Sequence, residues 1–305
     1  MSSYLVAIAS LALIYSLLAY GLNLQWGHTG IINFGHAAFF ATGAYASALL
    51  TRAGFPIIIG IIAGMILAGL FAIPIGRLTL RLKEDYLSVV TIGFSEVVRL
   101  TLLNSKWSGG ANGLTGIPRI FAEFGRDLRP IFWFFTTLAI VLAVYYLLQQ
   151  LIESPFGRVL RAIRCDEVAV SSLGKDVAWF RMTTLVFGSM LAGLAGSLYA
   201  HWVGFVVPDQ FTTAVTFATW TGIALGGSNH FGAVAGTVLL VSLLEATRFL
   251  GDFGIPIDMT LLANLRFVLV GLLLVIILQV KPKGLLPYRH KTLIYKNSKA
   301  EKIPE

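Results

Sequence analysis

The residues that could do chemistry in this sequence are charged and polar side chains within long apolar runs. Glu96 and Arg99 lie three residues apart in one such run. Glu245 and Arg248 repeat that spacing in a later run. Residues three apart share one face of a helix, so each pair can neutralise itself. Because a charge at the centre of a bilayer costs roughly 3 kcal/mol on insertion scales, the spacing favours buried structural ion pairs, with a proton relay as the alternative.

A second polar group surrounds a glycine-rich stretch near the start of the chain. Gly27, Gly30 and Gly35 are expected to interrupt helical structure there. Backbone that leaves the helix at membrane depth persists only where protein or a water-filled cavity satisfies its polar groups. The polar side chains of this stretch include Asn23, Gln25, Asn33 and His36. We expect these four to line part of a translocation path, and hydrogen bonding between helices is the alternative for Asn33 and His36.

The longest polar interruption with a strong positive charge is the segment 153–181. Ser154 can cap a helix whose first residue is Pro155, and Gly174 is a typical stop, so about five turns are expected between them. The charged residues that this helix would present are Arg158, Arg161, Arg164, Asp166 and Glu167. The pattern predicts a docking helix at the membrane surface that offers charge to a partner. The alternative is a basic loop that only fixes topology.

Composition places the whole chain in a membrane. Of its 305 residues, 56% are hydrophobic and only 12% are charged, whereas charged residues make up about a quarter of an ordinary soluble domain. The net charge of +8 comes mainly from short segments that flank apolar runs, so nucleic acid is not an expected partner. The apolar N-terminal run lacks a basic leader, which predicts that it is retained as the first membrane helix.

Nine apolar runs have roughly the length of a membrane helix, and they predict an all-α, polytopic bundle. The runs are 4–24, 30–50, 56–76, 86–104, 130–152, 182–204, 211–226, 232–250 and 261–279. The short seventh run and the glycine-rich second run could instead be re-entrant. We expect residues 1–280 to form one transmembrane domain that contains the docking segment, followed by a basic tail at 281–305.

Orientation follows from the distribution of lysine and arginine. Fifteen of them lie in 77–85, 153–181 and 280–305, and five lie in the connectors predicted on the other side. The positive-inside rule therefore places the C-terminus in the cytoplasm and, with nine spans, the N-terminus outside. The tail also suits contact with anionic lipid headgroups.

Small residues should hold the helices together, because lipid supplies no hydrophobic force between them. In the third run, glycine or alanine recurs at every fourth position. The residues of this ridge are Gly60, Gly64, Ala68, Ala72 and Gly76. Further small residues, Gly193, Gly232 and Gly236 among them, favour close packing in the sixth and eighth runs.

Several catalytic and nucleotide-binding motifs are absent from the sequence. There is no Gly-x-x-x-x-Gly-Lys-[Ser/Thr] phosphate loop, so no ATP or other cofactor is expected to bind this chain itself. A His-Glu-x-x-His metal motif, a Cys-x-x-Cys pair and a Gly-x-Ser-x-Gly elbow are missing too, and Cys165 is the single cysteine. Catalysis by this chain is therefore not expected.

Three segments resemble the permease subunits of branched-chain amino-acid ABC importers. They are SPFGRVLRAIRCDEVAVSSLG within the docking segment, residues 21–50, and KPKGLLP at 281–287. The resemblance implies two ATPase subunits that hydrolyse ATP, a second and usually different permease chain, and an extracytoplasmic substrate-binding protein. It also implies that 155–173 is the coupling helix. Hydrophobic amino acids are the expected cargo, with urea or small amides as the alternative within the family.

An ion-coupled secondary transporter is the competing class. It would use the two Glu-x-x-Arg pairs as coupling sites, but their acids are expected to be paired, and no strong inverted repeat is visible. Uptake that requires ATP and other subunits would separate the two classes.

Overall fold

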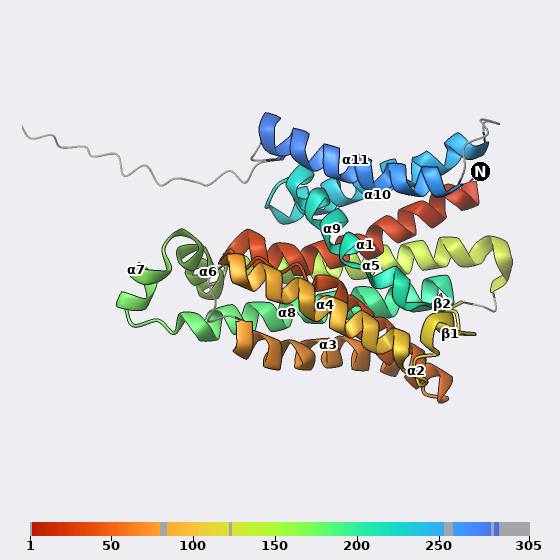
Figure 1. Cartoon of the computed structure of the whole chain (residues 1–305), viewed down its shortest axis with the longest axis horizontal. Helices are drawn as coiled ribbons and strands as arrows, with labels where there is room; N and C mark the ends of the chain where they lie inside the picture. The colour runs from red at the N-terminus through yellow and green to blue at the C-terminus, as the bar shows by residue number, and fades with distance from the viewer. Residues whose placement is uncertain (1, 80–83, 122–123, 253–258, 282–283, 287–305) are drawn as a thin grey trace, which may run out of the picture.

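The computed structural model describes residues 2–79, 84–121, 124–252, 259–281 and 284–286, and within them the fold is almost entirely helical (Figure 1). The first helices are α1 (Ser2–Thr29), α2 (His36–Arg52), α3 (Ile57–Thr79), α4 (Glu84–Asn104) and α5 (Gly125–Glu153). Two short helices follow, α6 (Pro155–Cys165) and α7 (Glu167–Ser172). The last helices are α8 (Val177–Val203), α9 (Thr213–Gly226), α10 (His230–Asp252) and α11 (Met259–Val280).

Each of the nine apolar runs forms one helix, which confirms the all-α bundle. Within the described residues, five helices are long and apolar enough to cross a membrane, namely α1, α3, α4, α5 and α8. The total of nine crossings stays a prediction. Four boundaries differ from the expected ones by five residues or more: α1 continues to Thr29, α2 begins only at His36, α5 begins at Gly125 and α8 at Val177. The break between α1 and α2 starts at Gly30, whose φ of 77° lies in the left-handed region that glycine adopts without strain.

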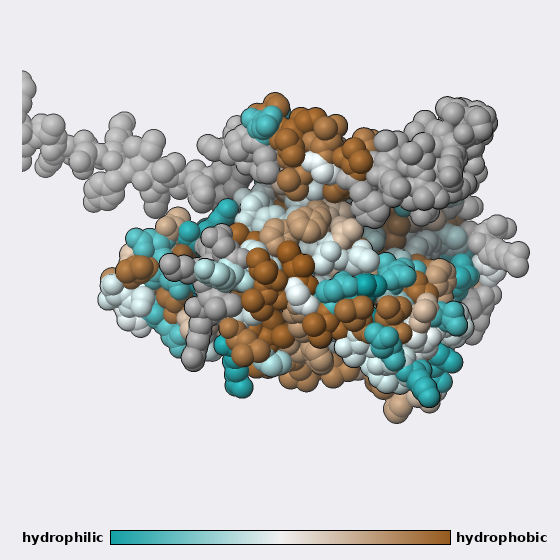
Figure 2. Space-filling model, viewed as in Figure 1, coloured by the Kyte–Doolittle hydropathy of each residue, from teal (hydrophilic) through white to brown (hydrophobic). Residues whose placement is uncertain are grey.

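The centre of the bundle is formed by α1, α2, α3 and α8, whose side chains meet in one apolar core. Leu17, Leu18, Phe40 and Leu198 are buried in it almost completely. On the opposite face of α3, Ile58, Ile62, Ile66 and Leu70 are exposed. Figure 2 shows apolar residues across the middle of the visible face, and polar residues gather toward its two ends. This distribution suits a helix bundle immersed in lipid.

The ridge of small residues on α3 is confirmed as a packing surface. Gly60, Gly64, Ala68, Ala72 and Gly76 are all buried, and their helix lies against α2 and α8. A Cβ added to Gly64 would lie 2.7 Å from the carbonyl oxygen of Gly43 on α2. A Cβ added to Gly193 on α8 would lie 2.5 Å from the Cβ of Ala68. Both contacts are too close for a larger residue.

Another glycine contact joins α9 to α10. A Cβ on Gly236 of α10 would lie 2.1 Å from the carbonyl oxygen of Gly222 on α9. The chain after α11 returns to this pair, where the amide of Leu285 donates to the carbonyl of Leu225 at 2.8 Å. Main-chain contacts therefore hold α9 and α10 together at one end. Residues 282–283 and 287–305 of the predicted tail lie outside the described residues.

A small cap covers the end of the bundle that carries the N-terminus. It contains the 3-10 helices η1 (Gly110–Asn112) and η3 (Pro208–Phe211) and the two-residue strands β1 (Leu114–Thr115) and β2 (Phe205–Val206). The strands pair antiparallel, with Leu114 opposite Val206 and Thr115 opposite Phe205. At the opposite end lie α6, α7 and the C-terminal end of α11 (Figure 1). The docking segment and the end of α11 thus share one side of the bundle.

Candidate functional site

The docking segment consists of two helices, so the expected single helix of about five turns was wrong. Pro155 is the first residue of α6, as predicted. The helix ends at Cys165 because Asp166 takes an extended conformation, with φ −158° and ψ 102°. The Asp166 carboxylate then accepts a hydrogen bond from the amide of Ala169 and caps α7. The chain turns after α7 at Gly174, which has a φ of 75°.

Ser154 occupies the predicted position before α6, but its side chain does not cap the helix. Its hydroxyl instead donates to the carbonyl of Leu151 at 2.5 Å. A second internal bond fixes α6 against the end of α5, because Arg161 Nη1 donates to the carbonyl of Ile152 at 2.9 Å. Arg161 is half-buried. Arg161 therefore makes a contact within the chain, and its part in binding a partner stays a prediction.

Arg164 also bonds within the chain. Its Nη1 donates to the main-chain carbonyl of Gly27 near the end of α1. The guanidinium carbon also lies 5.9 Å from the centroid of the Trp26 ring, which is within the range of a cation–π contact. On the other side of the segment, Arg181 of α8 forms an ion pair with Glu167 at 2.8 Å. Arg158, Arg164, Asp166 and Glu167 are all exposed. Arg158 makes none of the internal bonds described for the other three, so it is the charge best placed for a partner.

The four polar residues near the start of the chain are buried together between α1, α2 and α8. Asn33 Nδ2 donates to Gln25 Oε1 at 2.9 Å. Gln25 Nε2 donates across to the carbonyl of Leu185 on α8 at 3.2 Å. His36 Nε2 lies 3.2 Å from the carbonyl oxygen of Leu18. The bonds of Gln25 and His36 connect helices, and the Asn33 bond fixes the non-helical break against α1. Lining of a path by these residues stays a prediction.

Asn23 belongs to the same buried group but reaches another part of the fold. Its Nδ2 donates to the carbonyl of Ser228, in the turn between α9 and α10, at 3.1 Å. The side chain is completely buried. Asn23 therefore links α1 to the α9–α10 pair, whereas Gln25 links α1 to α8.

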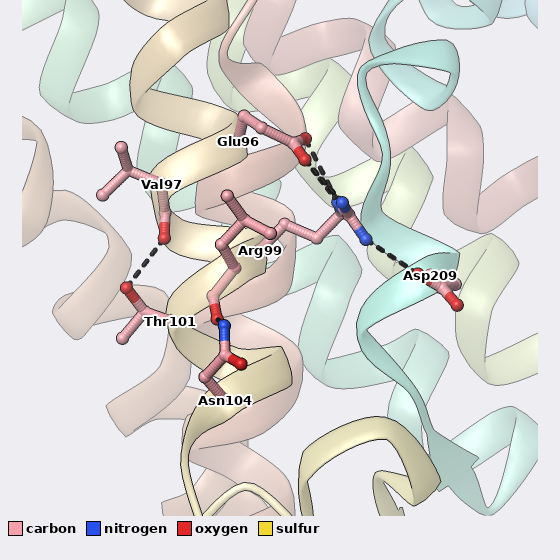
Figure 3. A network of polar contacts seen from close by, with 7 residues as sticks. Glu96, Val97, Arg99, Thr101, Asn104 and Asp209 are labelled. Atoms are coloured by element: carbon pink, nitrogen blue, oxygen red, sulfur yellow. Dashed lines mark hydrogen bonds and ion pairs between the residues drawn. The ribbon is translucent and has the colours of Figure 1, made fainter.

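The Glu96–Arg99 pair forms as predicted, but it is not buried within this chain. Arg99 Nε donates to both Glu96 carboxylate oxygens at 3.1 Å. The side chains of Arg99 and Glu96 are 18% and 43% exposed. Sequence reasoning missed a third member, Asp209 of η3, whose Oδ1 accepts from Arg99 Nη1 at 2.8 Å. Figure 3 shows Arg99 reaching from α4 across to η3 between the two carboxylates.

The predicted Glu245–Arg248 pair is only half described. Glu245 is buried, with 8% of its surface exposed. The side chain of Arg248 lies outside the part of the structure that is described. Their pairing stays a prediction.

A cavity of 580 Å³ lies between α1, η3, α9, α10 and α11. Its walls are mainly apolar, with Val215, Phe217, Leu240, Val241 and Leu274 among them. Its polar lining includes Tyr15, Asp209, Gln210, Thr212 and Glu245. Volumes of about 300–1,000 Å³, apolar walls and a few polar groups are typical of small-molecule sites. None of the four predicted path residues lines it.

Known proteins resemble this chain along nearly its whole length. Residues 4–278 match the family described as branched-chain amino acid transport system / permease component. The high-affinity branched-chain amino acid transport system permease protein LivM of Escherichia coli is 33% identical over 97% of this chain and 73% of its own length. A probable LivM of Methanocaldococcus jannaschii is 30% identical over 90% of each chain. LivH of Escherichia coli is 24% identical over 89% of this chain and 91% of its own length.

The helix bundle, its apolar belt and these similarities define a multi-pass membrane protein of the transport permease class. The chain belongs to the branched-chain amino acid transport system permease family. No solved structure matches it.

Proposed function

We propose that this chain is one permease subunit of an ABC importer for branched-chain or other hydrophobic amino acids, and that separate subunits bind and hydrolyse its ATP. The observation that supports this most directly is the α6–α7 segment. It projects from one end of the bundle (Figure 1), it exposes Arg158 and Asp166, and it is bonded to α1 through Arg164. A segment that exposes charge to a partner and is also bonded to α1 can transmit a partner's movement to the bundle.

The route of that movement runs through the end of α1. An ATPase that displaces α6 would pull on the Gly27 carbonyl, because Arg164 is bonded to it. Gly27 lies between Asn23 and the non-helical residues 30–35. We propose that Asn23, Gln25, Asn33 and His36 border the part of the translocation path that rearranges when α6 moves.

The partners follow from the family. We propose two ATPase subunits, a second permease chain and an extracytoplasmic binding protein that delivers the amino acid. The similarity to both LivM and LivH supports a heterodimer of related permeases, since these are distinct proteins of one organism. We propose that the C-terminus and α6–α7 are cytoplasmic and that the N-terminus lies outside. The fifteen basic residues of three segments support this orientation.

Reconstitution tests the proposal. The transporter assembled on this chain should take up radiolabelled L-leucine only with ATP, and a protonophore should not reduce the uptake. Uptake by this chain alone that collapses with the protonophore would instead establish an ion-coupled transporter. Uptake of labelled urea without leucine uptake would keep the ABC mechanism and replace the substrate.

A further inference from the structure

Arg99 and Asp209 connect two elements that are far apart in sequence. Arg99 lies on α4, and its guanidinium bonds Glu96 on the same helix and Asp209 on η3. Arginine carries more N–H donors than these contacts use, and Asp209 accepts only through Oδ1 in them. The group therefore keeps hydrogen-bonding capacity for a ligand.

The charged group lies at the accessible surface of the single chain. Asp209 and Glu96 are 75% and 43% exposed in the single chain. Charged residues in membrane segments face protein or water, because lipid tails cannot solvate them. Asp209 lies on η3 in the cap at the end of the bundle, so the surface formed by η3 and the adjoining part of α4 is expected to face water or another polar subunit surface.

The same aspartate also lines the 580 Å³ cavity. Apolar side chains from three helices form the cavity wall, among them Phe217 on α9, Leu240 on α10 and Leu274 on α11. Arg99, the acids Glu96 and Asp209, and an apolar cavity that also carries Glu245 are thus adjacent, and Asp209 is the residue they share.

We propose that this arrangement is a binding site for an aliphatic zwitterion, meaning a small molecule with an ammonium, a carboxylate and a hydrocarbon side chain. The inference rests on the proposed function, which supplies a substrate of that class. Arg99 binds the carboxylate, Asp209 binds the ammonium, and the hydrocarbon side chain enters the cavity.

The charges of the site explain why it would accept this ligand class. The zwitterion brings one charge of each sign, so the net charge of the site does not change when it binds. An amine without a carboxylate leaves the remaining Arg99 donors unused. A carboxylate without an ammonium pairs with Arg99 but adds a negative charge to a site that already carries several acids. Charge-assisted bonds to both ends of the ligand therefore select molecules that carry both groups.

Photolabelling tests the site directly. The transporter is purified by affinity for this chain and embedded in lipid nanodiscs. It is then irradiated with a diazirine analogue of L-leucine, and the labelled peptides are identified by mass spectrometry. We expect labelling in α9 and in 237–245 of α10, and excess L-leucine should suppress it. The compounds 3-methylbutylamine and 4-methylpentanoate, which each lack one charged group, should suppress it at least about tenfold less effectively, the equivalent of one charged hydrogen bond.

Two pairs of variants separate ligand binding from structure. Arg99→Gln should reduce the protectable labelling about tenfold, and Arg52→Gln, a change of the same chemistry at the end of α2, should not. Gly271→Leu should remove the labelling by filling the cavity, since a Cβ at Gly271 meets no heavy atom within 4 Å. Leu272→Phe adds volume at the exposed neighbouring position and is the control.

The outcomes distinguish this inference from the proposed function. Labelling that leucine does not suppress, or that Arg99→Gln and Gly271→Leu leave unchanged in a correctly assembled transporter, would overturn the binding site. If the wild-type transporter still imports leucine in that case, the proposed function stands without this binding site. If the wild type imports no hydrophobic amino acid, the substrate given under the proposed function is wrong.

Discussion

Arg164 of α6 donates a hydrogen bond to the main-chain carbonyl of Gly27 in α1, and this bond attaches the docking segment to the transmembrane bundle. Because the acceptor is a backbone atom, its position is set by the path of α1 and does not depend on the rotamer of another side chain. The other two arginines of α6 differ in their contacts. Arg161 bonds the Ile152 carbonyl at the end of α5, and Arg158 is exposed. Arg161 and Arg164 thus both bond the rest of the chain, and Arg158 and Arg164 are both exposed.

Replacing Arg158 should affect partner binding without affecting the permease fold. Arg158→Glu should weaken ATPase association by about 2 to 5 kcal/mol, the range for breaking a hydrogen-bonded charge pair at an interface. Pull-down of the ATPase and surface plasmon resonance measure the loss. The thermal unfolding temperature of the permease alone should not change. Unaltered ATPase binding would remove Arg158 from the interface.

Replacing Arg164 should have the opposite pattern. Arg164→Met should destabilise the permease alone by about 1 kcal/mol, the usual net value of one hydrogen bond, because the Gly27 carbonyl loses its donor. Amide hydrogen exchange should become faster in α6 at the same time. Arg158→Met is the matched control, since it removes an arginine from the same helix. Equal effects of the two substitutions on exchange in α6 would contradict the anchor.

Glycine substitutions test the packing of the bundle. Gly43→Ala on α2 should destabilise the protein by about 1 to 3 kcal/mol, because its Cβ would lie 2.1 Å from the carbonyl oxygen of Gly193. Gly93→Ala on α4 should stabilise it by about 0.5 to 1 kcal/mol, because a Cβ there meets nothing within 4 Å and alanine favours helix. Thermal unfolding in detergent measures both. A destabilising Gly93→Ala would show that α4 is packed against a partner.

The fold could be predicted from sequence where one local rule decided it. Hydrophobic length gave the helices, and the four-residue spacing of small residues gave the packing face of α3. The break of the docking segment at Asp166 was missed because the residue suits a helix start as well as a charged surface. Asp209 was missed for a different reason. It is separated from Arg99 by 110 residues, and no periodicity in a single sequence connects such positions.

The exposure of the charged residues was also beyond sequence reasoning. Glu96 and Arg99 were expected to be buried because they lie in an apolar run, yet α4 lies at the surface of the isolated chain with Val97 and Leu100 exposed beside them. Whether such a surface meets lipid or a second subunit depends on assembly. Sequence spacing predicted the pair itself, because that depends only on the helix repeat.

Cys165 offers a test of orientation and docking in one experiment. It is the only cysteine of the chain, it is exposed, and it is the last residue of α6. If α6 is cytoplasmic, a membrane-impermeant maleimide should label Cys165 in inside-out vesicles and not in intact cells. Bound ATPase should slow the labelling severalfold, because a docked subunit covers the surface that carries Arg158 and Asp166. Cys165→Ser is the control for reagent specificity. Labelling of intact cells would reverse the proposed orientation and place α6 away from any cytoplasmic ATPase. If inside-out vesicles are instead labelled at the same rate with and without ATPase, the orientation stands, but the end of α6 is excluded from the docking surface.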